Sequence, residues 1–139
     1  MDLIFDRTLE DVRMGTPKGC YSWEDLNRVE KAVAQLQLRM RQMDLSVTVS
    51  TKTDWALPQE MDRDQWPARE QMDRYLQNVL KLLTALRLQK PLPASMKYLD
   101  YQGANQIEAA LFAVEQRLDS IESTYQFSGE CIAGKENTI

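Results

Sequence analysis

Three stretches of the chain repeat apolar residues at alternating steps of three and four. They cover residues 26–43, 72–86 and 104–121. This spacing keeps side chains on one face of a helix and is typical of the seams between packed helices. The pattern therefore predicts three long helices that bury their apolar faces against one another.

Capping signals predict where the first helices begin. Thr8 with Asp11, and Ser22 with Asp25, both have the capping-box spacing, in which a hydroxyl and a carboxylate satisfy the free N–H groups of the first turn. The first pair predicts a short helix that ends near Gly15. The second pair predicts the start of the first long helix.

Prolines limit the second long helix. Pro67 suits the first position of a helix, and the prolines at 91 and 93 cannot continue one, so we expect this helix to run to about residue 89. Residues 101–103 are expected to lead into the third long helix, which is predicted to end near residue 123.

Two segments favour β-strands. Leu45, Val47 and Val49 alternate with hydroxyl residues over 45–51, which is typical of a half-buried strand. Residues 125–133 indicate a second strand with a glycine bulge, and we expect the two to pair. The predicted fold class is mainly α, a three-helix bundle with a small two-stranded β appendage. We expect one helical domain over 1–139, with a short N-terminal helical segment at 1–18 and a frayed tail at 135–139.

A short similarity links the predicted helices. Residues 26–30 resemble residues 104–108, and Asn78 with the valine that follows it partly matches both. Each of the asparagines Asn27, Asn78 and Asn105 lies beside an apolar seam, where its amide could tie a loop carbonyl to the helix. A polar residue that merely flanks the core explains the pattern equally well.

Charge and composition argue against two classes of partner. The chain has 17 Lys and Arg against 21 Asp and Glu, for a formal net charge of −4, and the basic residues are scattered among acidic ones. Nucleic-acid binding needs clustered basic residues, and docking on a membrane surface needs a basic face. We therefore expect no nucleic-acid partner and no membrane partner.

The residues that most often carry catalysis are missing or unsupported. The chain has no histidine, the side chain that most often supplies a base with a pKa near 7. Glu108 with Glu115, and Asp119 with Glu122, have helical spacings, but we expect them on a solvated outward face. The sequence predicts a protein that is not an enzyme and that has no cofactor and no metal site.

Several large apolar side chains are candidates for a protein interface instead. Two of them are tryptophans near polar or extended segments. Three form an apolar triplet before the first capping box, and this triplet could also pack on the chain's own bundle. The last two lie in the predicted C-terminal strand, where they would anchor strand addition to a neighbouring protein. In chain order these candidates are Leu3, Ile4, Phe5, Trp55, Trp66, Phe127 and Ile132.

Six segments in a fixed order give the chain a family resemblance. They lie at 5–12, 18–30, 47–55, 75–79, 104–108 and 128–134, and include Phe5-Asp6-Arg7-Thr8, Asp25-Leu26-Asn27-Arg28-Val29-Glu30, Lys52-Thr53-Asp54-Trp55 and Ala104-Asn105-Gln106-Ile107-Glu108. Together they resemble small proteins and C-terminal domains encoded among the tail and baseplate genes of Firmicutes prophages. Members of that family often carry a longer insert where this chain has only residues 13–17.

The resemblance implies a structural component of a phage tail or tail-like particle, assembled in the bacterial host cytoplasm. Its partners would be other tail or baseplate proteins, and the helical seams leave a homo-oligomer open. The alternative is a soluble phage-encoded adaptor, assembly chaperone or host-factor inhibitor. The family supplies no catalytic residues to carry over.

Overall fold

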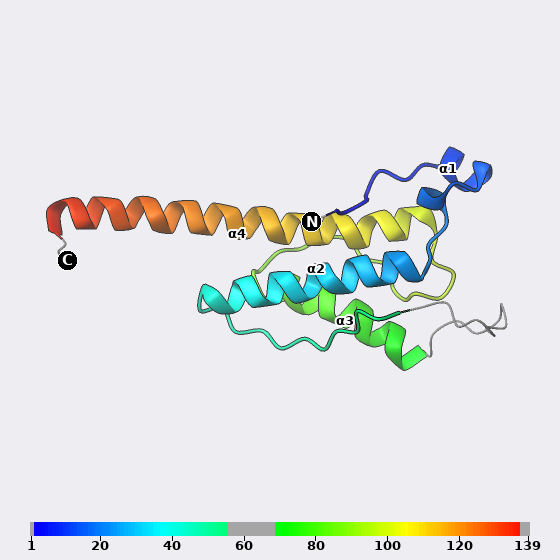
Figure 1. Ribbon diagram of the computed structural model, residues 1–139, viewed down its shortest axis with the longest axis horizontal. Helices are drawn as coiled ribbons and strands as arrows, with labels where there is room; N and C mark the ends of the chain where they lie inside the picture. The colour runs from blue at the N-terminus through cyan, green and yellow to red at the C-terminus, as the bar shows by residue number, and fades with distance from the viewer. Residues whose placement is uncertain (1, 56–68, 137–139) are drawn as a thin grey trace.

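Three long helices form the body of the protein (Figure 1). The computed structural model describes residues 2–55 and 69–136, with side chains described as far as residue 124. All three pairs of long helices are in contact, so the predicted mainly α fold is confirmed. In chain order the elements are α1 (Leu9–Met14), the 3-10 helix η1 (Pro17–Gly19), α2 (Trp23–Gln42), α3 (Arg69–Ala85) and α4 (Tyr101–Glu136).

The core lies between α2, α3 and α4 and is built from the three predicted seams. Val29, Val79 and Leu111 are fully buried, one from each long helix. At the far ends of the seams the burial fades, because Met43 is only half-buried and Ile121 is 36% exposed. The helical periodicity therefore identified the buried faces correctly.

Both predicted capping boxes are present. At the start of α1, the hydroxyl of Thr8 accepts from the Asp11 N–H at 3.2 Å, and the Asp11 carboxylate accepts from the Thr8 N–H at 2.9 Å. Ser22 and Asp25 make the same exchange at the start of α2. Helix α1 ends at Met14 and is capped by Gly15, which has a left-handed φ of 66° that favours glycine.

Helix α3 ends at Ala85, about four residues earlier than predicted. Arg87 adopts a left-handed φ of 57°, and the N–H groups of Arg87 and Leu88 donate to the carbonyls of Thr84 and Leu83. This is a Schellman motif, which usually contains glycine at the left-handed position. Because an arginine takes that position here, the sequence carries no stop signal before the prolines. The predicted start at Pro67 lies outside the described residues.

The predicted β appendage is wrong: neither predicted strand forms in the part of the chain that the structure describes. Residues 125–133 continue α4, because positions 125, 128 and 132 prolong its steps of three and four, and a glycine within a helix costs only about 1 kcal/mol. Residues 45–55 are extended, but side chains of α2 and α3 take the place of a partner strand. Residues 135 and 136 also belong to α4, whereas 137–139 lie outside the description.

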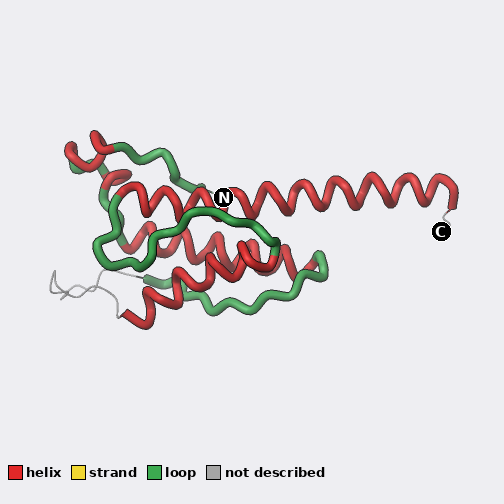
Figure 2. The backbone as a smooth tube through the Cα atoms, turned by 180° about the vertical axis from the view of Figure 1, so that it is seen from behind, coloured by secondary structure: helices red, strands yellow, loops and turns green. Residues whose placement is uncertain are grey.

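The connections run along the surface of the bundle. The extended segment 45–55 follows α2 and α3, and the segment between α3 and α4 returns along the length of the bundle (Figure 2). Residues 2–8 cross over α4 before α1 begins, and α4 itself continues well past the ends of the other two long helices (Figure 1).

Candidate functional site

The N-terminal arm, residues 2–8, is held on α4 by two side chains. The Asn105 carboxamide accepts from the N–H of Arg7 at 3.0 Å and donates to its C=O at 2.9 Å. One turn further along α4, the Glu108 carboxylate accepts from the N–H of Ile4 at 2.9 Å. We call Asn105 and Glu108 the α4 clamp.

Helix α2 holds the extended segment 45–55 in the same way. Asn27 accepts from the N–H of Trp55 at 2.7 Å and donates to its C=O at 2.6 Å. Glu30 accepts from the N–H of Lys52 at 3.2 Å. Asn27 and Glu30 form the α2 clamp, and its contacts match those of the α4 clamp atom for atom.

The two clamps share one register. In each, a step of three residues forward along the helix corresponds to a step of three residues back along the extended chain, so the chain runs opposite to the helix. A carboxamide carries the same donor and acceptor as a peptide group, and it can therefore pair with an extended backbone as a neighbouring strand would. This explains how both segments are held on the bundle without a sheet.

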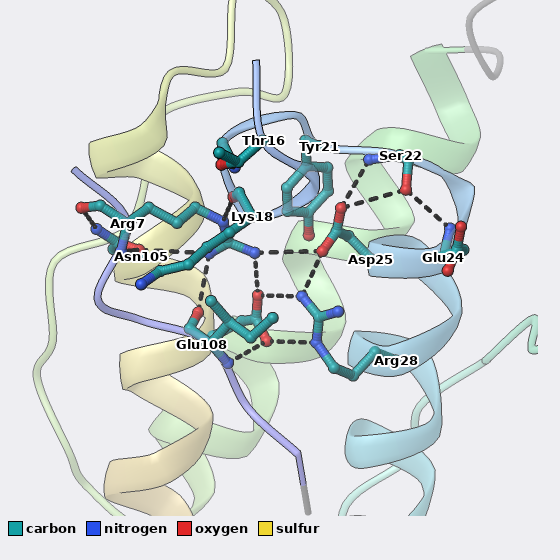
Figure 3. A network of polar contacts seen from close by, with 12 residues as sticks. Arg7, Thr16, Lys18, Tyr21, Ser22, Glu24, Asp25, Arg28, Asn105 and Glu108 are labelled. Atoms are coloured by element: carbon teal, nitrogen blue, oxygen red, sulfur yellow. Dashed lines mark hydrogen bonds and ion pairs between the residues drawn. The ribbon is translucent and has the colours of Figure 1, made fainter. Parts of the chain in front are cut away.

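The carboxylate of the α4 clamp lies in a buried network of four charges (Figure 3). Glu108 receives Arg7 at 2.6 Å and a two-pronged contact from Arg28 at 2.9 and 2.7 Å. Asp25, which also caps α2, bonds both arginines. The side chains of Arg7 and Glu108 are 1% and 0% exposed, so water does not solvate them. The two positive and two negative charges of the network therefore compensate each other.

Arg7 also ties the arm to η1. Its Nε donates to the C=O of Lys18 at 3.0 Å, one Nη donates to the C=O of Ile4 at 2.8 Å, and the guanidinium lies over the ring of Tyr21. One buried guanidinium thus joins the arm, η1, α2 and α4. The arrangement fixes where the N-terminal part of the chain lies.

The carboxylate of the α2 clamp is paired across to α3. Glu30 is 1% exposed and receives two contacts of 2.8 Å from Arg74 and one of 2.7 Å from the indole N–H of Trp55. The hydrogen bond to Glu30 raises the pKa of Arg74, although partial burial opposes the shift. In both clamps, therefore, an arginine of another long helix neutralises the glutamate: Arg28 of α2 pairs with Glu108, and Arg74 of α3 pairs with Glu30.

A tyrosine pair lies between the two clamps. The hydroxyl groups of Tyr21 and Tyr75 are hydrogen-bonded to each other, and Tyr75 is 1% exposed. Burial raises the pKa of Tyr75 well above its ordinary value, and the neighbouring tyrosine and the carboxylates of Glu108 and Glu30 add to the shift. Both hydroxyls therefore remain protonated at any physiological pH.

The interface candidates from the sequence separate into several groups. Trp55 is half-buried and held by the α2 clamp, and Leu3 packs against the core. Ile4 is half-buried, whereas Phe5 is 40% exposed and stacks on Phe112 with ring centroids 5.1 Å apart.

For the other three interface candidates, the structure describes no side-chain position. Phe127 and Ile132 lie within α4, which corrects their predicted place in a strand, and their side chains fall beyond the described ones. Trp66 lies outside the described residues.

The expected surface position of Glu108 is wrong, because this residue is fully buried. Asp119 and Glu122 are exposed as predicted and lie beside Arg39. The signal that could have revealed the clamps is the spacing Asn-Xaa-Xaa-Glu, which occurs in both 26–30 and 104–108. A glutamate three residues after a seam-flanking asparagine faces the same side of the helix.

Two further findings bear on function. None of the helices, as far as they are described, combines the length and the apolar character needed to cross a membrane. Comparisons with protein-family models, curated proteins and solved structures found no match to this chain.

Proposed function

We propose that this protein is a non-enzymatic structural component of a phage tail or phage-tail-like particle. It would dock onto neighbouring tail or baseplate proteins through the projecting part of α4, residues 123–136. The sequence resemblance to prophage tail and baseplate proteins supports a place in a tail particle. The length of α4 beyond the bundle supports docking through this helix.

The observation that carries the proposal is the length of α4 beyond the bundle. Arg39, near the end of α2, contacts Asp119 at 2.6 Å and lies 3.7 Å from Glu122, which places the end of α2 beside residues 119–122. Past this point, no other helix of the described part of the chain lies beside α4 (Figure 1). With 36 residues, α4 is about 54 Å long.

A projecting helix of this kind needs a partner. It continues a helix that is already formed in the bundle and so pays no nucleation cost, but most of the stability of a helix in a protein comes from packing against neighbours, which the projecting part lacks within the described chain. Helical spacing places positions 121, 125, 128 and 132 on one side of α4, in line with the seam that packs inside the bundle. A neighbouring protein that covered this side would stabilise the projecting part.

The rest of the molecule suits a rigid anchoring body. Glu108, Glu30, Arg7 and Arg74 are engaged in contacts within the chain. Buried, mutually satisfied polar networks fix one arrangement of the segments that they join. A rigid body with one projecting helix is compatible with docking into an assembly.

A proline in the projecting helix tests this mechanism. Ser128→Pro should break α4 beyond the bundle, since proline within a helix costs about 3 kcal/mol, whereas Ser128→Ala keeps the helix. Each variant would replace the wild-type protein in the producing strain, and its amount in purified particles would be measured. We expect Ser128→Ala to be incorporated normally and Ser128→Pro to be lost; equal incorporation of both would contradict docking through α4.

A further inference from the structure

Helix α3 carries a third, incomplete version of the clamp. Asn78 accepts from the N–H of Ser50 at 3.3 Å and donates to its C=O at 2.6 Å, as Asn27 and Asn105 do with their own segments. Three residues later, where the other helices have a glutamate, α3 has Lys81. Three residues before Ser50, the corresponding position of the extended segment is Val47. The third clamp thus has its amide but a cation in place of its carboxylate.

An open groove lies at this position. Lys81 is exposed and forms no ion pair within the described part of the chain, and Leu80 beside it is 45% exposed. The groove separates residues 46–48 of the extended segment from one side of α3. It is lined by Ser46, Val47, Thr48, Gln77, Leu80, Lys81, Thr84 and Ala85.

The backbone of the extended segment presents a free edge to the groove. Side chains alternate over 45–50, with the odd-numbered ones half-buried and the even-numbered ones exposed. The C=O of Val47 points to Gln37 on α2, whereas both polar groups of Ser50 point to α3. Val47 and Ser50 lie three residues apart and point to opposite helices, as in a strand, and the same local alternation places the backbone groups of Ser46 and Thr48 on the α3 side. Their backbone groups form no hydrogen bond with the residues that the structure describes.

We propose that this groove binds an extended, acidic peptide segment of a partner protein, which adds a strand to the edge formed by Ser46 and Thr48. The inference rests on the proposed function in that the segment would belong to a neighbouring protein of the particle. It names a second contact, separate from the projecting part of α4.

Three features select this occupant. The backbone groups of Ser46 and Thr48 are exposed and have no partner among the described residues, so they are open to pairing with another extended backbone. Leu80 offers an apolar contact to alternate side chains of the incoming strand. Lys81 attracts a carboxylate, since it stands where the two filled clamps carry a negative charge that an arginine neutralises. An uncharged or basic segment would leave Lys81 without a partner.

Selection from a displayed library of random peptides, with the full chain as bait, tests the charge of the occupant. We expect the enriched peptides to be rich in β-branched and acidic residues. A synthetic, fluorescently labelled copy of the most enriched peptide should bind at least tenfold more weakly to Lys81→Glu, and more weakly at high salt. Lys31→Glu, which changes an exposed lysine on α2, is the matched control and should bind as the wild type does.

Amide hydrogen exchange tests the strand addition itself. The N–H groups of Ser46 and Thr48 should exchange rapidly in the free protein and slowly with the same peptide bound, while amides of α4 stay unchanged. Failure to enrich acidic peptides, binding that survives Lys81→Glu, or unchanged exchange at both amides would each overturn the inference. None of these results depends on incorporation into particles, so the proposed function stands or falls separately.

Discussion

At the scale of single residues, the most consequential group is the Glu108 carboxylate, which two arginines approach in a fully buried position. Removing one partner of a buried ion pair leaves an uncompensated charge, which costs more than the pair contributes. Glu108→Gln should therefore lower the free energy of unfolding by about 3–5 kcal/mol in urea denaturation.

The matched control for this substitution is Asp119→Asn. Asp119 also accepts from an arginine, but its side chain is 63% exposed. Exposed pairs contribute about 0–1 kcal/mol, so this variant should unfold almost as the wild type does. Equal losses for Glu108→Gln and Asp119→Asn would contradict a buried network.

The asparagine of the α4 clamp gives a second prediction. Asn105→Ala removes both hydrogen bonds to the backbone of Arg7 and should destabilise the protein by about 1–3 kcal/mol. The amide of Arg7 should then exchange with solvent faster, as measured by hydrogen-exchange NMR. Gln116→Ala, at an exposed position of α4, should change neither quantity.

The buried tyrosine gives a dependence on pH. The folded protein keeps Tyr75 protonated above the pH near 10 at which an unfolded tyrosine ionises, so there the unfolded state binds fewer protons. The free energy of unfolding should fall as pH rises above 10, and Tyr75 contributes up to about 1.4 kcal/mol per pH unit. Tyr75→Phe should flatten this slope, whereas Tyr98→Phe, at a residue 90% exposed, should leave it unchanged.

Sequence reasoning located part of this chemistry. The similarity between 26–30 and 104–108 marked Asn27 and Asn105, and the idea that their amides tie neighbouring chain to the helix is confirmed by their contacts. The glutamates were missed because a charged residue beside a seam is usually solvated. Their partners Arg7 and Arg74 lie 101 and 44 residues away in sequence, and no local pattern predicts pairings across such separations.

At the scale of elements, local signals were sufficient where the cause is local. The capping boxes of Thr8 and Ser22 predicted two helix starts because the interacting groups lie three residues apart. The alternation over 45–51 predicted a half-buried strand; the half-buried side is present over 45–50, but the strand is not. It could not reveal that Gln37, Asn78 and the α2 clamp replace a partner strand, since that depends on how the helices pack.

The projecting part of α4 gives a prediction for a shortened chain. A protein that ends at Thr124 should keep its free energy of unfolding within about 1 kcal/mol, because a helix without neighbours contributes little to stability. Its far-ultraviolet circular dichroism should lose the signal of the missing turns. A loss of several kcal/mol in urea denaturation would mean that the projecting part packs on the bundle.

At the scale of the whole molecule, the described chain consists of a helical bundle and the projecting part of α4, called the projection below. The bundle consists of α2, α3 and α4 up to about residue 122, and the two clamps fix the N-terminal arm and the segment 45–55 on its surface. In the proposed account, the projection and the α3 groove would contact other molecules. This division fits a protein that acts by docking.

The most direct test of that account is quantitative mass spectrometry of gradient-purified phage or tail-like particles from a strain that produces this protein. We predict that the chain occurs at a constant ratio to the tube protein in every preparation. If it is abundant in the lysate but absent from intact particles, the structural role is contradicted, and a soluble adaptor, chaperone or host-factor inhibitor takes its place.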